Sequence, residues 1–387
     1  MSGSAAFLHR FKSLLPKHRA PQEEILAWLA TAHAQAEMTL NAPASDEERE
    51  ALIRNIKKRV IRFGCSTDRI QYRNSSLDDF THTDWEKMRI FSLKSRPAGR
   101  SAQERSQLYA EVVNEVFQQF YSEEQNSPSV LVHVTCTGYV SPSGAQRLVA
   151  SKNWGESTEV FHAYHMGCYA ALPAVRLAKS FLAGGKTSVD LVHTELCTLH
   201  LDPTQHGVEQ LMMQTLFADG LIRYSASPVP PTAESSLEVL TAREEIIPNT
   251  ENEMTWMASD HGMRMTLSRS IPDRIAEVLD GFLCRLVTPT RISVDEMKKN
   301  AIFAVHPGGP RIIDHVKDLL GLRDDQVAAS NRILRAYGNM SSATLPHIWQ
   351  SILEDESVPP NTPVVSLAFG PGLTISSAVL TKRHCPT

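Results

Sequence analysis

The stretch that decides the fold begins with VLVHVT at residues 130–135, continues with HMGCYAALPAVRLAKSFL at 165–182 and ends with VDLVHTE at 189–195. The first and last runs are short and rich in branched apolar residues, which predicts strands buried on both faces. The middle run is mostly apolar or small and is entered through Gly167, which predicts a helix over Met166–Leu182. A strand, a helix and a second strand in this order favour a layered α/β fold with a largely parallel sheet.

The same plan returns later in the chain. Residues 302–305 predict a strand that ends in His306 and a Pro-Gly-Gly loop. Residues 310–320 predict a helix with proline in its first turn, and residues 364–369 predict a final strand. Each half therefore repeats the order of strand end, loop and helix.

The two halves are separated by a stretch of different composition. Residues 225–252 carry proline, serine and charge, which predicts a surface excursion. We therefore expect an N-terminal half over residues 1–235 and a C-terminal half over residues 236–387. The first 60 residues are polar-rich and predict helices.

Composition excludes several classes of protein. The formal charge is −4 and the basic residues are scattered apart from a small cluster near Lys57, so we expect no nucleic acid partner. No run approaches the length of a membrane span and no leader is recognisable, so we expect a cytoplasmic protein. Six cysteines without a C-x-x-C pair indicate reduced thiols, and the question is whether one of them is reactive.

Three residues form a candidate catalytic group. Cys168 falls in the first turn of a predicted helix, where unpaired N–H groups and the helix dipole lower a thiol pKa. His306 ends a strand and can pair with such a thiol, while the amide of Asn339 can donate to an enolate or oxyanion. Each residue alone also fits a plain role as a buried cysteine, a satisfied histidine or a helix cap.

Several blocks occur in an order that resembles a known family. They are CYAAL at 168–172, VHPGGP at 305–310, YGNMSSA at 337–343 and FGPGLT at 369–374, with TLFADG at 215–220. These blocks resemble those of the type III polyketide synthases, which are the chalcone-synthase-like members of the thiolase superfamily. The resemblance implies a five-layered αβαβα thiolase-like fold with two duplicated halves, in agreement with the alternation above.

The resemblance also implies a reaction. Cys168 would accept an acyl group, His306 would stabilise its thiolate, and Asn339 would share an enolate with His306. Phe217 would stand between the pocket and the tunnel for the thioester. The chain would act as a homodimer on acyl-CoA or acyl carrier protein thioesters, and we expect no metal and no further cofactor.

The tunnel mouth is expected to contact the substrate's phosphate end. Lys57 and Lys58 would lie there, where the phosphate of a pantetheine or of a carrier-protein phosphoserine approaches. Gly308 and Gly309 would let the backbone approach a ligand closely.

The chain departs from the plant members in ways that bear on substrate. Met265 stands where those carry a second gatekeeper phenylalanine, which predicts a flexible and wider wall. The block ELCTLH at 195–200 is closer to bacterial alkylresorcinol and alkylpyrone synthases, and we expect Cys197 to line the pocket. The chain is also similar to stand-alone ketosynthases that join two β-ketoacyl chains into the α-pyrone of myxobacterial antibiotics such as myxopyronin and corallopyronin. In that reaction Glu195, or less strongly His200, would serve as an extra base.

Other possibilities stay open. An iterative enzyme that extends a starter with malonyl-CoA fits the same residues. A non-catalytic relative that binds an acyl carrier protein, or a Cys-His-Asn hydrolase, fits them less well. The remaining cysteines are expected to be structural thiols; they are Cys65, Cys136, Cys284 and Cys385.

Overall fold

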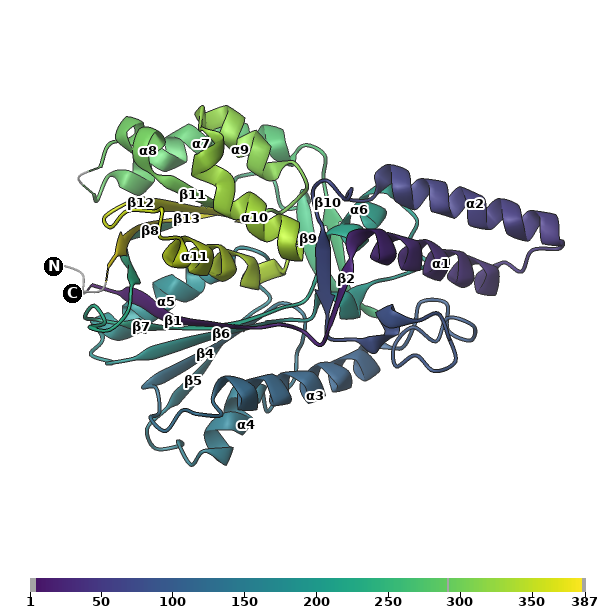
Figure 1. The fold of residues 1–387 in the computed structure, drawn as a ribbon, viewed down its shortest axis with the longest axis horizontal. Helices are drawn as coiled ribbons and strands as arrows, with labels where there is room; N and C mark the ends of the chain where they lie inside the picture. The colour runs from purple at the N-terminus through teal and green to yellow at the C-terminus, as the bar shows by residue number, and fades with distance from the viewer. Residues whose placement is uncertain (1–4, 291, 385–387) are drawn as a thin grey trace.

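A nine-stranded mixed sheet organises the molecule. The computed structural model describes residues 5–290 and 292–384, and within them the strand order is β11-β12-β13-β8-β1-β7-β6-β4-β5. Figure 1 shows these strands running through the centre of the molecule with helices on both sides. The strands are β1 (Phe7–Leu14), β4 (Val130–Thr135), β5 (Glu159–Tyr164), β6 (Val189–Glu195), β7 (Gly220–Ser227), β8 (Ser236–Ile246), β11 (Ile302–Val305), β12 (Pro363–Gly370) and β13 (Thr374–Arg383).

The two ends of the sheet repeat one pattern. From the centre outwards, β1 pairs with β7 and β7 with β6 in antiparallel sense, whereas β6 pairs with β4 in parallel sense. On the other side β8 pairs with β13 and β13 with β12 in antiparallel sense, and β12 pairs with β11 in parallel sense. The halves join where β1 pairs with β8 through Leu8 and Leu237. The two ends of the chain's strand order therefore follow one pairing pattern within one continuous sheet.

Helices complete five layers. α5 and α11 lie between the two halves of the sheet, α3 and α4 cover the outer face of one half, and α7, α8 and α9 cover the other (Figure 1). A hairpin of α1 and α2 projects from one end. The helices are α1 (Gln22–Leu40), α2 (Asp46–Phe63), α3 (Ala102–Phe120), α4 (Gly144–Ser151), α5 (Ala171–Ala183), α6 (Val208–Leu216), α7 (Ile271–Val287), α8 (Val294–Asn300), α9 (Ile312–Leu320), α10 (Ala328–Tyr337) and α11 (Thr344–Glu354). No helix among the described residues is long and apolar enough to cross a membrane.

Smaller elements frame the ends of the sheet. Two small two-stranded sheets pair β2 with β3 and β9 with β10 in antiparallel sense. Their bounds, with those of the 3-10 turns, are β2 (His18–Pro21), β3 (Tyr72–Ser75), β9 (Met254–Ser259), β10 (Gly262–Leu267), η1 (Asp78–Thr81), η2 (Cys197–His200), η3 (Asp324–Val327) and η4 (Ser341–Ala343).

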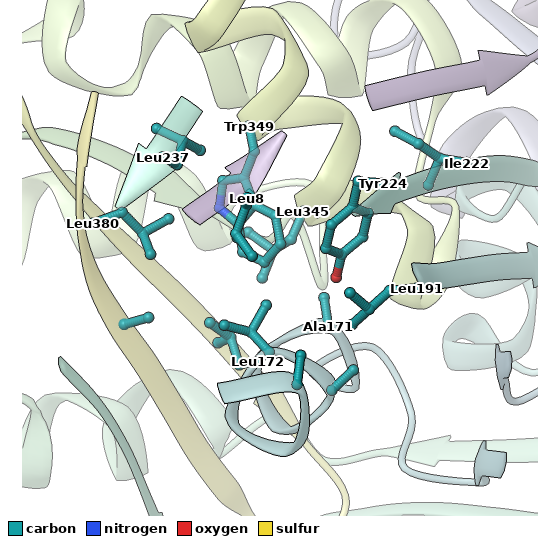
Figure 2. Packing of buried hydrophobic residues seen from close by; sticks show 14 of the residues in the cluster. Leu8, Ala171, Leu172, Leu191, Ile222, Tyr224, Leu237, Leu345, Trp349 and Leu380 are labelled. Atoms are coloured by element: carbon teal, nitrogen blue, oxygen red, sulfur yellow. The ribbon is translucent and has the colours of Figure 1, made fainter. Parts of the chain in front are cut away.

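The core explains why the decisive strands are largely apolar. In β4, Val130, Val132 and Val134 face the central helices, while Leu131 packs under α3. Figure 2 shows the central layer, where side chains of α5 and α11 pack between strands of both halves. Because side chains alternate along a strand, a strand covered on both faces favours apolar residues on both of its faces.

Some sequence predictions were wrong. Residues 7–14 form the central strand β1, although basic residues hide their alternation, and the first helix begins only at Gln22. The excursion predicted over 225–252 contains the long strand β8, and the boundary predicted at residue 235 lies in the loop before it. The helix predicted from Met166 begins at Ala171.

A buried ion pair accounts for a charged residue inside β7. The Arg223 side chain is 3% exposed and lies 2.6 Å from Glu124 and 3.5 Å from Asp190. It also donates to the carbonyl of Phe120 at the end of α3. Arg223 therefore ties the end of this outer helix to the sheet.

Candidate functional site

Cys168 lies in a tight turn between β5 and α5. Gly167, just before it, has φ +80°, and a Cβ at that position would lie 2.8 Å from the Pro371 side chain. The Gly167 N–H donates to the Cys136 sulfur over 2.9 Å, and the Cys136 thiol contacts the Gly167 carbonyl at 3.4 Å. Loops that follow β4 and β12 therefore fix the turn that presents Cys168.

The surroundings of Cys168 correct one expectation. The thiol is buried three residues before α5 begins, and burial raises its pKa to about 12. Two contacts partly offset this rise in pKa. The Ser341 hydroxyl lies 3.9 Å from the sulfur, and the Asn339 side chain also contacts it. The prediction of a thiol pKa lowered by the helix start is therefore wrong, because burial has the larger effect on this unliganded thiol.

Asn339 is held beside Phe217. The Asn339 N–H donates to the carbonyl of Leu216 at 3.0 Å, and its carbonyl accepts from the N–H of Ala218 at 2.8 Å. The side-chain oxygen accepts from the N–H of Ser341 at 2.9 Å. The buried side-chain NH₂ has no partner among the described residues, so Asn339 presents a free donor next to the thiol.

His306 ends β11 with its ring unpartnered. Its backbone N–H donates to the carbonyl of Leu367 at 2.8 Å, which fixes the residue to β12. Neither ring nitrogen has a partner among the described residues, although the residue is buried. Burial lowers the pKa of His306 to about 3, so the imidazole is neutral and can donate through one nitrogen and accept through the other.

Two hollows meet at Cys168. An inner cavity of about 60 Å³ and a cleft of about 990 Å³ both have Cys168, Gln210 and Met265 in their walls. Of the residues predicted to contact substrate, the inner cavity is lined by Cys197, His200, Phe217 and Met265, and the cleft by Gly308, Gly309 and Met265. Sequence reasoning missed other lining residues of the inner cavity; they include Cys136, Thr137, Met213, Trp256 and Ser341.

Glu195 and His200 differ in what they can do. Glu195 is fully buried and lines neither hollow. Its carboxylate accepts hydrogen bonds from the hydroxyls of Thr137 and Ser342, and burial raises its pKa. His200 donates to the carbonyl of Thr137 at 2.8 Å and accepts from the N–H of Met263 at 3.0 Å. The prediction of His200 as an extra base is therefore wrong, because both of its ring nitrogens are occupied.

The lysines predicted near the tunnel mouth lie on α2, whose last residue, Phe63, lines the cleft. Lys57 and Lys58 follow the buried Ile56 on α2 and point to solvent, and neither lines the cleft. Instead, the cationic side chains in the cleft wall are arginines that sequence reasoning missed; they are Arg264, Arg269 and Arg311. A signal existed for Arg311, which directly follows the His-Pro-Gly-Gly-Pro block.

The other cysteines occupy varied places. Cys65 and Cys136 are buried, whereas Cys284 is exposed on α7. Cys385 lies outside the described residues. In the part of the chain that the structure describes, no group of three or more histidine, cysteine, aspartate or glutamate side chains is placed to hold a metal ion.

Comparison with known proteins finds a family that matches part of the chain. Residues 238–383, which include β11, β12 and the segments of His306 and Asn339, match the family described as chalcone and stilbene synthases, C-terminal domain. Probable polyketide synthase 1 of Dictyostelium discoideum is 33% identical to this chain over 258 residues, 65% of the chain. The chain spans about 8% of the length of that curated relative.

Solved structures share the fold of this chain. The C-terminal type III polyketide synthase domain of Steely1, a type I/III hybrid from Dictyostelium, matches with a TM-score of 0.79 and 24% identity over 97% of this chain and 99% of that one. PKS-I from the brown alga Ectocarpus siliculosus matches with a TM-score of 0.80 and 21% identity over 99% of both chains. The 1,3,6,8-tetrahydroxynaphthalene synthase of Streptomyces coelicolor A3(2) matches with a TM-score of 0.76 and 20% identity over 97% of this chain and 99% of that one. The predicted thiolase-like fold is thereby confirmed.

Proposed function

We propose that this chain condenses acyl thioesters, with Cys168 as the residue that carries the acyl group. One observation carries the proposal: the thiol stands where the inner cavity meets the cleft and contacts the unpartnered amide of Asn339. The cleft would admit the thioester arm, with its three arginines near the phosphates, and the inner cavity would receive the acyl chain.

The first step is transfer of the acyl group to Cys168. As the sulfur attacks the thioester carbonyl, its proton passes to a ring nitrogen of the neutral His306, and the departing thiolate takes a proton in return. The new S–C bond forms as the old one breaks, so the step needs no other reactant. The raised pKa of Cys168 makes this proton transfer necessary, because few molecules hold a free thiolate at neutral pH.

The second step is formation of a carbon–carbon bond. A second thioester loses carbon dioxide or an α-proton and becomes an enolate, whose oxygen accepts hydrogen bonds from Asn339 and His306. The enolate carbon then attacks the acyl-Cys168 carbonyl, and the Cys168 sulfur leaves. Buried donors that already lack partners are suited to this task, since nothing must be displaced before they bind the oxyanion.

Intact-protein mass spectrometry tests the proposal. After incubation with octanoyl-CoA, the wild type should gain one octanoyl mass, and Cys168→Ala should gain none. Cys197→Ala is a matched control that should still be acylated, because this thiol lines the same cavity but does not hold the turn of Cys168. Acylation of Cys168→Ala, or no acylation of the wild type by CoA, carrier-protein or small-thiol thioesters, contradicts the proposal.

We further propose that the reaction joins two preformed β-ketoacyl chains and closes an α-pyrone. In this reaction the second substrate loses an α-proton, and Glu195 would serve as base through Thr137, whose hydroxyl faces it. The alternative is iterative extension with malonyl-CoA. Product formation from two β-ketoacyl thioesters without malonyl-CoA supports joining, and an absolute need for malonyl-CoA contradicts it.

The inner cavity bears on the length of the acyl chain. Its volume of about 60 Å³ is small beside the cleft's volume of about 990 Å³, so a longer chain would need the lining side chains to rearrange. Three methionines line it, Met213, Met263 and Met265, and methionine is the apolar side chain that rearranges most readily. This lining supports an adaptable pocket for alkyl chains.

We also propose that the chain works as a homodimer. β5 is an edge strand of the sheet, and Phe161 on it is 39% exposed. An uncovered strand edge with an exposed aromatic residue is a template for pairing with a second copy. Light scattering should give the mass of a dimer, and Phe161→Lys should shift the protein towards the monomer.

A further inference from the structure

Four buried side chains form a line of hydrogen bonds that ends on Glu195. The Tyr224 hydroxyl contacts Nε2 of His193 at 3.3 Å, and Nδ1 of His193 contacts the Ser342 hydroxyl at 3.1 Å. The Ser342 hydroxyl donates in turn to Oε1 of Glu195. All four residues are fully buried. We call this set the Tyr224 chain, and of its members only Glu195 has a part in the proposed reaction.

The Tyr224 chain joins elements from both halves of the sheet. His193 and Glu195 are two residues apart on β6, so their side chains lie on the same face of the strand. Tyr224 lies on the neighbouring β7 in the central layer (Figure 2), and its ring stacks on that of His193 with centroids 5.6 Å apart. Ser342 lies in η4, three residues after Asn339. The line therefore connects the core to the segment that carries Asn339.

The hydrogen bonds of the Tyr224 chain run in one direction. Burial lowers the pKa of His193 to about 3, so its ring is neutral and has one donor and one acceptor nitrogen. Burial raises the pKa of Tyr224, so its hydroxyl keeps its proton. Among the described residues this hydroxyl has no hydrogen-bond partner except Nε2 of His193, so it donates there. The His193 proton is then on Nδ1 and is donated to Ser342, whose own proton is donated to Glu195.

This direction favours the ionised form of Glu195. Burial raises the pKa of the Glu195 carboxyl, and the hydrogen bond from the Ser342 hydroxyl is the largest effect that lowers it again. Glu195 has no cationic partner in the part of the chain that the structure describes, so hydrogen bonds stabilise its charge. With the other tautomer of His193, Nδ1 would accept the Ser342 proton and the carboxylate would lose this donor.

The other titratable groups around the Tyr224 chain are neutral. His193 faces His347, and burial lowers the pKa of His347 to about 4. Glu195 faces five thiol and phenol groups whose pKa is raised by burial; they are Cys136, Cys168, Cys197, Tyr109 and Tyr139. At neutral pH these groups carry no charge, so the charge of the cluster is that of Glu195.

We propose that Tyr224 and His193 are positioning residues, which hold the Ser342 hydroxyl as a donor to Glu195 and so keep this carboxylate ready to take a proton. The proposal rests on the proposed function, in which Thr137 connects the substrate to Glu195. The α-proton of the substrate passes to the Thr137 oxygen as the Thr137 proton passes to Oε2 of Glu195, and the electron pair of the broken C–H bond stays on the substrate as the enolate. Oε1 keeps its hydrogen bond from Ser342 throughout.

Infrared spectra across a pH titration measure the protonation of Glu195 without any substrate. The C=O stretch of its protonated carboxyl is the band that is lost in Glu195→Gln. Tyr224→Phe keeps the ring but removes the donor, so it should raise the pH of half-protonation by about 1 unit, the usual size of one hydrogen bond.

Tyr164→Phe is the matched control. The Tyr164 hydroxyl also contacts a buried histidine ring, that of His133, at 2.8 Å. The other nitrogen of His133 contacts the Thr194 hydroxyl and no carboxylate. Tyr164→Phe should therefore leave the titration of Glu195 unchanged.

A double variant tests whether Tyr224 acts through Ser342. Ser342→Ala removes the donor itself and should raise the pH of half-protonation further than Tyr224→Phe does. Once Ser342 is replaced, Tyr224→Phe should add nothing. A Tyr224→Phe titration that matches the wild type, or two shifts that simply add in the double variant, would overturn the proposal.

Two activities separate this proposal from the proposed function. In Tyr224→Phe the acidic limb of the pH profile for condensation of 3-oxooctanoyl-CoA should move up by the same amount, while octanoyl-CoA acylates Cys168 at the wild-type rate. An acidic limb that stays in place while the infrared titration moves overturns the role of the Tyr224 chain in proton transfer. If no thioester acylates the wild type, the proposed function fails, and the infrared titration still decides how Glu195 is held.

Discussion

Replacing Gly167 tests how the turn before Cys168 is held. Gly167 has φ +80°, a backbone conformation that costs an alanine about 1–3 kcal/mol. The new Cβ would also lie 2.8 Å from Pro371, and forcing such a contact in a packed site costs a further ~1–3 kcal/mol. Gly167→Ala should therefore lower the free energy of unfolding by about 2–6 kcal/mol.

Gly185 provides a matched control. It has φ +93° just after α5, and nothing lies within 4 Å of the position its Cβ would take. Gly185→Ala thus incurs the backbone cost of about 1–3 kcal/mol without the clash. Urea unfolding of both variants isolates the contribution of Pro371 as the difference between them.

Acylation of Cys168 gives the functional readout. A shift of about 1 Å in a reacting group can lower a rate about a hundredfold, so Gly167→Ala should acylate at least tenfold more slowly per folded molecule. Gly185→Ala should acylate at the wild-type rate. The reasoning is refuted if the two variants are equally stable, or if Gly167→Ala keeps the wild-type rate of acylation.

Three further predictions concern charge, core and pocket. Glu195→Gln removes a negative charge that helps to raise the pKa of Cys168. The pH profile of Cys168 alkylation by iodoacetamide should therefore move to lower pH, and a move to higher pH contradicts this. Arg223→Met leaves the buried carboxylate of Asp190 without its cation and should lower the free energy of unfolding by about 3–5 kcal/mol in urea, with acylation per folded molecule unchanged. Met265→Ala should let Cys168 carry longer acyl chains in intact mass spectra, whereas Met257→Ala, at an exposed methionine, should not.

The sequence predicted those elements whose pattern is local. β4 and β11 were predicted with the bounds they have, because both faces of each are covered and most positions are apolar. β1 was not predicted, since its basic residues hide the alternation and its pairing partners, β7 and β8, lie more than 200 residues away. Long-range pairing leaves little trace in a short window of sequence.

The site divides in the same way. Cys168, His306 and Asn339 were proposed from short blocks of residues, each of which sits at the end of a strand or before a helix. Lys57 and Lys58 were expected near the mouth; the helix buries the face of Ile56 and leaves both lysines exposed. Arg264 and Arg269 were missed because they follow no recognisable block and reach the cleft only through the β9–β10 hairpin.

By itself the sequence predicted the layered α/β fold and proposed a cysteine, a histidine and an asparagine as a catalytic group. Only the tertiary structure decided their protonation, because a pKa depends on burial and on neighbours from distant segments. In the folded protein the pKa of the Cys168 thiol is raised, and neither ring nitrogen of His306 has a partner among the described residues. Both ring nitrogens of His200 are hydrogen-bonded, so His200 is not a candidate base. Those properties depend on contacts between loops from both halves of the sheet. These loops are far apart in the sequence, so no single stretch of sequence predicts the contacts.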